Sequence, residues 1–484
     1  MGDLVLILGY DAAGSRAVAQ ALRAEQIYCR IVSPAISREE AAAQSPRGLI
    51  LAGGVSGEIP APVDPGLLDG SWPVLALGDA AAMLCRSLGG EALEMALCGG
   101  IGAVSFTPCP LTEGIDACER MLRSVRQLRL SEFTRVLATS QDTAVGLMHA
   151  HLPLYGLQFA LEPNDTDGMR LLLNFALNIC GCTRWWNDGV CVENAVEDLR
   201  RHVGEGRAVC AVTGGLNSST VAALAHRALG DRLQCIFVDT GLMRENEGAQ
   251  ALEFYRGVLG LDVRHVQAES RFLDALNGIA DPDEKRRVIS RTLQSVLDET
   301  LAQMGDFALI LRSTTADDLM RGEDIACRPG LRGGVPTYQP LRELFKEEVR
   351  RVAECLGLPQ EIIRRPSFPG TGLALRILGE VTPARLQTLR AAEQVFSEEV
   401  SAAGLTRRMR HHFAVLAPMP GDDPRAVVVL RAVQSTDAPL AYAARLPYDL
   451  LERVTESILR KRPEVTRVVY DLTPSTRKTG VEWQ

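Results

Sequence analysis

The stretch Ala208–Ser219 reads AVCAVTGGLNSS, and it decides the fold of the middle of the chain. Its first five residues are all apolar, which is typical of a buried strand in a parallel sheet. A glycine pair and two serines follow, and a helical pattern then runs to about Leu229. The next apolar run, Gln234–Val238, ends in Asp239-Thr-Gly. This order of strand, glycine-rich loop, helix and strand predicts a βαβ unit of a doubly wound α/β fold.

The loop Thr213–Ser219 has the composition of a phosphate-binding loop. Glycines let the backbone approach an anion closely, and the free N–H groups at a helix start donate to it. The loop lacks the Gly-Lys-Ser ending of the common nucleoside-triphosphate loop, so that motif is excluded. A simpler interpretation stays open, in which Ser218 and Ser219 are N-cap residues of an ordinary strand-to-helix turn.

The patterns on either side of this unit indicate two further domains. Residues 1–184 alternate short apolar runs with amphipathic stretches such as Ser15–Ala24, which predicts a doubly wound sheet. The strands expected there are Leu4–Leu8, Tyr28–Val32, Gly48–Leu51 and Val74–Leu77. The polar stretch Thr183–Gly189 marks the first boundary, and the second domain spans residues 185–366 with a first helix at Cys191–Val203. Residues 367–484 predict a small α+β domain. Its expected elements are helices Pro383–Ala403 and Asp449–Lys461 and strands Ala426–Val433 and Val465–Leu472.

The composition excludes several classes of protein. Lys and Arg number 52 against 60 Asp and Glu, and the net charge of −8 argues against nucleic acid or a membrane surface as a partner. The first apolar run, Leu4–Leu8, is far shorter than the ~20 residues of a membrane span, so we expect a cytoplasmic protein. The 12 cysteines are too dilute for a disulfide scaffold. We interpret Cys180 and Cys182 as core thiols rather than as a redox or zinc site.

The stretch Arg207–Glu245, RAVCAVTGGLNSSTVAALAHRALGDRLQCIFVDTGLMRE, resembles the ATP-pyrophosphatase domain of the GMP synthetase family. The resemblance continues in order through Pro340–Pro359, Phe368–Pro383, Ala444–Val454 and Arg467–Trp483. Residues 1–184 resemble the family's class I glutamine amidotransferase domain. The resemblance implies a Rossmann-type ATP-pyrophosphatase domain, related to the adenine nucleotide alpha-hydrolases, and a C-terminal dimerisation domain.

The family hydrolyses glutamine to ammonia in its first domain. In its second domain it activates O2 of XMP with ATP, and ammonia then displaces AMP to give GMP. The resemblance therefore implies ATP and Mg²⁺ as cofactors, a purine nucleotide or purine-like molecule as substrate, and a homodimer.

The amidotransferase domain lacks two of the three side chains that hydrolyse glutamine. The family's nucleophile lies in Gly-(Val/Ile)-Cys-Tyr-Gly-Met-Gln, and Gly78 stands at the cysteine position in ALGDAAA. The family's base lies in Gln-Phe-His-Pro-Glu, and Ala160 replaces that histidine in QFALE. Only the orienting acid, Glu162, and the oxyanion-loop glycines Gly53 and Gly54 persist. Loss of a triad nucleophile alone costs on the order of 10⁶ in rate. The side chains that could form a substitute dyad are Cys98, Cys109, His149 and His151.

The synthetase site is altered in a different way. The residues that the resemblance assigns to ATP are Thr213, Gly214, Gly215, Leu216, Asn217, Ser218, Ser219, Val238, Asp239 and Lys346. Asn217 replaces an acidic residue that helps to hold Mg²⁺ in the family, and Asp318 matches a second acidic metal contact. Asparagine offers a neutral oxygen to a hard cation, so metal binding should be weaker. Lys346 matches a lysine that faces the pyrophosphate, although a solvated helix lysine is the alternative.

The XMP side of the site departs furthest from the family. The lid segment Cys327–Gly334 is shortened and holds Arg328 and Arg332 without a histidine, and the loop Pro418–Pro424 is also short. The residues that the resemblance assigns to the substrate are Arg376, Arg477 and Lys478. Arg376 and Glu380 could equally be retained for folding alone.

Two functions are therefore expected. The first is a divergent ligase of the GMP synthetase type that uses free or partner-supplied ammonia. The second is a pseudoenzyme with a nucleotide-binding, regulatory or assembly role.

Overall fold

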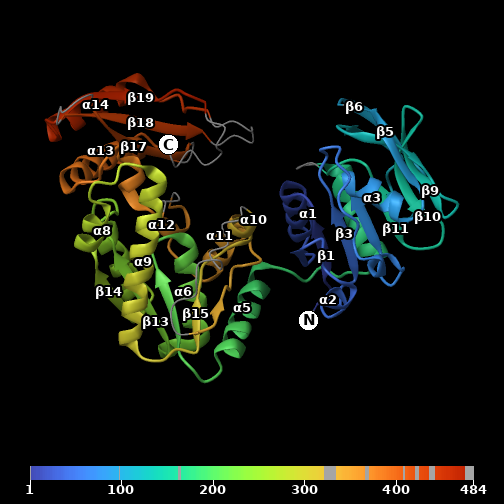
Figure 1. The fold of residues 1–484 in the computed structure, drawn as a ribbon, viewed down its shortest axis with the longest axis horizontal. Helices are drawn as coiled ribbons and strands as arrows, with labels where there is room; N and C mark the ends of the chain where they lie inside the picture. Colours follow the sequence, from blue (N-terminus) through green and yellow to red (C-terminus); the bar gives the residue numbers. More distant parts are fainter. Residues whose placement is uncertain are drawn as a thin grey trace. The chain divides into compact units, whose positions relative to one another are not determined.

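The computed structural model describes residues 2–97, 99–161, 165–320, 334–365, 370–406, 409–419, 425–434 and 442–474. The chain forms two compact units, Met1–Cys191 and Val192–Gln484 (Figure 1). The expected boundary at Thr183–Gly189 lies just before this division. The expected middle and C-terminal domains both belong to the second unit.

The first unit contains a nine-stranded sheet of order β2-β1-β3-β4-β11-β10-β9-β6-β7. The four predicted strands are confirmed and lie side by side in parallel, as β1 (Val5–Gly9), β2 (Cys29–Val32), β3 (Gly48–Ala52) and β4 (Val74–Leu77). The helices of this half are α1 (Ala12–Ala24), α2 (Arg38–Ala42), α3 (Asp79–Ser87) and α4 (Thr166–Leu173). Strands β1, β3 and β4 are buried along almost their whole length, as expected for a sheet covered on both faces.

The other half of this sheet is antiparallel and was not predicted. Strand β11 (Leu154–Leu157) pairs in parallel with β4 and antiparallel with β10 (Thr143–His149). The sheet continues through β9 (Thr134–Ser140), β6 (Ile101–Phe106) and β7 (Ala117–Met121). Strands β5 (Glu91–Leu97) and β8 (Val125–Arg129) form a separate antiparallel pair.

The second unit contains a parallel sheet of order β14-β13-β12-β15-β16. Its strands are β12 (Ala208–Val212), β13 (Leu233–Asp239), β14 (Val263–Gln267), β15 (Leu309–Leu311) and β16 (Thr337–Tyr338). Helix α9 (Pro282–Met304) packs on the face that carries Val209, Ile236 and Ile310. Helix α6 (Leu216–Leu229) contacts β12 and β13. Because the strands are parallel, the carboxyl ends of β12, β13 and β14 meet at one edge, where such folds bind ligands.

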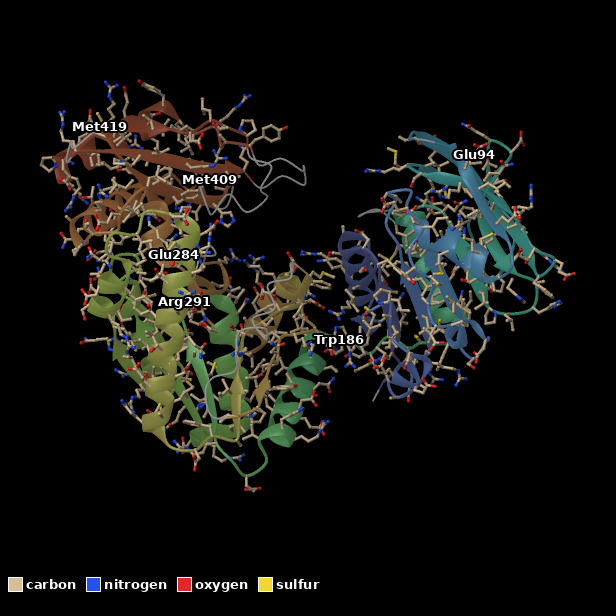
Figure 2. All side chains as sticks on the ribbon, in the orientation of Figure 1. Glu94, Trp186, Glu284, Arg291, Met409 and Met419 are labelled. Carbon is tan, nitrogen blue, oxygen red and sulfur yellow. The ribbon has the colours of Figure 1, made fainter. Side chains whose placement is uncertain are left out.

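A three-stranded sheet follows, with β17 (Met409–Pro418) antiparallel to β18 (Ala426–Gln434) and β18 parallel to β19 (Val465–Tyr470). Met409 begins β17 and Met419 follows its last residue (Figure 2). The predicted strands β18 and β19 and the predicted helices α13 (Pro383–Ala402) and α14 (Tyr448–Lys461) are confirmed. The remaining helices are α5 (Asp188–Val203), α7 (Glu247–Glu253), α8 (Glu269–Leu276), α10 (Ala316–Met320), α11 (Lys346–Cys355) and α12 (Gln360–Ile363).

One hydrophobic core joins the two parts of the second unit. It contains Phe272 of α8 and Ile289 of α9 together with Phe396 of α13 and Val428 of β18. The parallel sheet and the C-terminal sheet are therefore expected to unfold together. Within the described part of the chain, no helix combines the length and the apolar character that crossing a membrane requires.

Replacing Phe396 with alanine tests this shared core. The ring is fully buried, so its removal should lower the free energy of unfolding by about 3–5 kcal/mol. Hydrogen exchange should then accelerate in α8 and α9 as well as in α13, and stay unchanged in residues 2–191.

The matched control is Phe175→Ala, because Phe175 is equally buried in the first unit. In this control, the faster exchange should be confined to residues 2–191. Faster exchange in Phe396→Ala that is confined to residues 370–474 would contradict the shared core.

Candidate functional site

The glycine-rich loop lies between β12 and α6, as predicted. Gly214 has φ +77°, a left-handed conformation that favours glycine. Helix α6 begins at Leu216 with Gly215 at its N-cap, and no described side chain caps it. The interpretation of Ser218 and Ser219 as N-cap residues is therefore wrong. The Ser218 hydroxyl instead accepts from the amide of Thr213 and donates to the carbonyl of Gly215, each at 3.2 Å, and so closes the loop on itself.

At the start of α6, three amides have no acceptor within the helix. The first helical hydrogen bond runs from the amide of Ser219 to the carbonyl of Gly215 at 3.1 Å. The amides of Leu216, Asn217 and Ser218 precede it, so none of them has an acceptor within the helix. Such amides, together with the helix dipole, form a site for an anion.

Two side chains that sequence reasoning missed hold this loop. Tyr255 is fully buried, and its hydroxyl accepts from the amide of Gly214 at 2.9 Å. Arg365 donates through Nη1 to the carbonyl of Gly214 at 3.0 Å. Both residues lie far along the chain from the loop, and no local pattern marks either of them.

The carboxyl ends of β13 and β14 bring Asp239 and His265 together. One oxygen of Asp239 accepts from the amide of Gly241 at 3.0 Å, and the other lies 4.0 Å from Nε2 of His265. The His265 Nε2 is buried and has no hydrogen-bond partner among the described residues. Val238 is half-buried beside them and packs into the core. The predicted nucleotide residues of β13 thus lie at the same sheet edge as the loop.

The residues predicted to hold a metal ion are engaged differently. The Asn217 side chain is half-buried and forms no hydrogen bond to a described residue. One carboxylate oxygen of Asp318 accepts from the amide and the hydroxyl of Thr315, at 2.9 and 2.7 Å. Among the described residues, no group of three acidic, histidine or cysteine side chains is placed to hold a metal ion. The metal roles of Asn217 and Asp318 stay predictions.

Lys346 is the first residue of α11, and its amide donates to Asp317 at 2.8 Å. Its side chain is half-buried, so its predicted role at the pyrophosphate stays a prediction.

Of the three predicted substrate residues, only Arg376 lies among the described residues. Arg376 is only 2% exposed, forms an ion pair with Glu393 and lies over the ring of Phe413. Burial lowers the pKa of Arg376, although a guanidinium stays charged at any physiological pH. These contacts favour the folding role that the sequence left open. Arg477 and Lys478 lie outside the described residues, as do Arg328 and Arg332.

The turn that carries Gly78 keeps a strained shape. Gly78 follows β4 and precedes α3 with φ +62° and ψ −135°. A Cβ at this residue would lie 2.2 Å from the carbonyl oxygen of Gly54 and 2.8 Å from that of Gly53. The predicted oxyanion loop therefore fills the space that a nucleophile's side chain would need. Ala160 is half-buried, and Glu162 lies outside the described residues.

Asp79 fastens that loop to the turn. Its amide donates to the carbonyl of Gly54 at 2.8 Å, and its buried carboxylate accepts from Ser56 and from the amide of Gly57 at 3.1 Å each. The Arg126 guanidinium donates to the carbonyl of Gly57. Burial is the largest influence on the pKa of the Asp79 carboxyl, and it raises this pKa.

The substitute side chains are placed as follows. His149 uses Nδ1 to accept from the amides of His151 and Leu152, at 3.1 and 2.9 Å. Cys109 precedes a short 3₁₀ turn, Pro110–Thr112, and Cys98 lies outside the described residues. No contact joins a thiol to either imidazole among the described residues. Cys180 and Cys182 are buried free thiols, and burial raises the pKa of Cys182 to about 12, which confirms them as core residues.

Comparison with known proteins gives the relatives of this chain. A family model described as the GMP synthase C terminal domain matches residues 398–483. A protein of Thermosynechococcus vestitus is 36% identical, over 100% of this chain and 96% of its own length. Relatives in Symbiobacterium thermophilum and Caldicellulosiruptor saccharolyticus are 35% and 34% identical, each over 100% of this chain and 99% of their own length. All three are described as glutamine-hydrolyzing GMP synthases. This chain belongs to the GMP synthase family.

Proposed function

We propose that this chain is an ATP-dependent ligase of the GMP synthase type that lacks its own glutaminase activity. It would amidate XMP or a related purine-like acceptor and release AMP and diphosphate. The observation that carries the proposal is the row of amides without helical acceptors at the start of α6, at the same sheet edge as Asp239 and His265. A homodimer, a cytoplasmic location and free or partner-supplied ammonia belong to the same proposal.

The arrangement suits an adenine nucleotide. The phosphates would accept from the amides of Leu216, Asn217 and Ser218, while the adenosine lies over the carboxyl end of β13. The acceptor oxygen then attacks the α-phosphorus, and diphosphate leaves. Ammonia attacks the activated ring carbon and loses a proton, and AMP leaves with the acceptor's former oxygen. In both reaction steps the chain's own groups bind and orient the nucleotide. No residue of the chain is assigned as a ligand of Mg²⁺.

The loss of glutaminase activity is supported by two independent features. The sequence places glycine and alanine where a thiolate and its base are needed. The structure also packs the carbonyl of Gly54 against Gly78, in the space that a cysteine side chain would need. The second feature argues that a thiol at this residue would lack space, which supports free ammonia as the simpler nitrogen source.

Asn217 favours a second function, that of a nucleotide-binding pseudoenzyme. Its amide oxygen stands where the family has a carboxylate, which weakens any cation bridging it to the phosphates. The two functions share ATP binding and differ in turnover. Incubating the chain with ATP, Mg²⁺, XMP and ammonium separates them, because only the ligase releases AMP and diphosphate in an acceptor-dependent way.

Gly214→Ala is expected to weaken ATP binding at least tenfold by calorimetry. A Cβ there would meet Ala251 at 3.1 Å and Arg365 at 3.3 Å, on a backbone with positive φ. The matched control is Gly257→Ala, because Gly257 is exposed and has open space around it. Unchanged affinity in Gly214→Ala, or no ATP binding by the unmodified chain, would refute the site.

The double variant Gly78→Cys, Ala160→His restores the two lost side chains and should still produce no glutamate from glutamine. The new Cβ would overlap the carbonyl of Gly54, so we expect the stability to fall by about 1–3 kcal/mol. Ala160→His alone adds its ring at a half-buried position and should leave the melting temperature near that of the unmodified chain. Steady glutamate production by the double variant would show that the closed pocket opens.

A further inference from the structure

The peptide groups on the two sides of Gly214 are held by side chains from distant parts of the chain. On the amide side, the hydroxyl of Tyr255 accepts from Gly214 at 2.9 Å and lies 2.9 Å from the hydroxyl of Ser219. Tyr255 belongs to a π-helical turn, Phe254–Val258, and is fully buried. The Gly214 amide is thereby withdrawn from any phosphate.

On the carbonyl side, Arg365 donates to Gly214 at 3.0 Å. A carbonyl oxygen that faced the loop's interior would repel a phosphate, and the guanidinium holds it by a charge-assisted bond. Arg365 itself is kept in place by Glu247, 3.7 Å away, whose other oxygen accepts from the amide of Arg244 at 3.2 Å. Arg365 also brings a positive charge beside the loop.

These contacts divide the loop into two parts. The Gly214 peptide groups are bound to protein on both sides, while the amides of Leu216, Asn217 and Ser218 stay without helical acceptors. The direction of the free amides follows from the anchored Gly214, because only two residues lie between Gly214 and Asn217 and the backbone between them is short.

We propose that Tyr255 and Arg365 are positioning residues for the phosphate loop, and that they fix the orientation of its free amides before the nucleotide binds. The inference rests on the proposed function, since it concerns the same ATP site. It assigns two residues that have no place in the sequence motif. They act on the triphosphate and have no direct role toward the adenosine.

The experiment compares three probes by calorimetry: ATP, inorganic diphosphate and adenosine. Tyr255→Phe keeps the ring and removes the hydroxyl, which leaves the Gly214 amide and the Ser219 hydroxyl without a buried partner. We expect affinities for ATP and diphosphate to fall about tenfold and the affinity for adenosine to stay unchanged. Arg365→Gln should lower the same two affinities, and it provides a second variant if Tyr255→Phe folds poorly.

The matched control is Tyr10→Phe, which removes one hydroxyl hydrogen bond, to the carbonyl of Ala61 at 2.8 Å in the first unit. All three affinities should be unchanged in this control. If both variants bind ATP as tightly as the unmodified chain, or lose adenosine affinity in parallel, the positioning role is overturned. If the unmodified chain binds neither ATP nor diphosphate, the proposed function fails first and this inference fails with it.

Discussion

At the carboxyl end of β12 the chain turns through a left-handed glycine into a helix whose first amides have no acceptor in that helix. Buried or half-buried amides need a hydrogen-bond acceptor, so the first amides of α6 are suited to bind an anion or water. The surrounding residues hold the loop in this conformation. Ser218 closes the loop from within, Tyr255 and Arg365 bind Gly214 from outside, and no described side chain caps the helix.

The first unit makes the same kind of turn, with a different outcome. Gly78 also has positive φ between a parallel strand and a helix. Here the carbonyls of Gly53 and Gly54 occupy the space beside the glycine, and the Asp79 carboxylate accepts from the amide of Gly57 in the same loop. A glycine at this turn connects the strand to the helix without a side chain that would meet the loop. The two turns differ in the atoms beside the glycine: backbone carbonyls lie beside Gly78, and the side chains of Ala251 and Arg365 lie beside Gly214.

The shared core of the second unit explains why the turn at Gly214 can be stable independently of the turn at Gly78. Phe272, Phe396 and Val428 bind the parallel sheet and the C-terminal sheet into one folded body. The first unit forms its own core around β1, β3 and β4. Substitutions in the first unit therefore need not disturb the packing that supports the loop after β12.

The sequence by itself determined most of the regular architecture. The parallel strands β1 to β4, the strands β12 and β13 and helices such as α13 were predictable, because continuous apolar runs and 3.6-residue periods report burial directly. The glycines at residues 78 and 214 and the loss of the thiol and imidazole were also visible without a structure. Strands β5 to β11, β14 to β16 and β17 were not predicted, since their apolar patterns are short or irregular.

Only the tertiary structure decided which atoms lie beside the glycine in the turns at Gly78 and Gly214. That outcome depends on Gly54 lying against Gly78 and on Tyr255 and Arg365 reaching Gly214, contacts that join residues 24, 41 and 151 positions apart. The tertiary structure likewise placed Arg376 in the core, paired with Glu393, where the motif had suggested a substrate contact. A sequence motif names the residues near a ligand, but the free space beside them is set by chain segments that the motif does not contain.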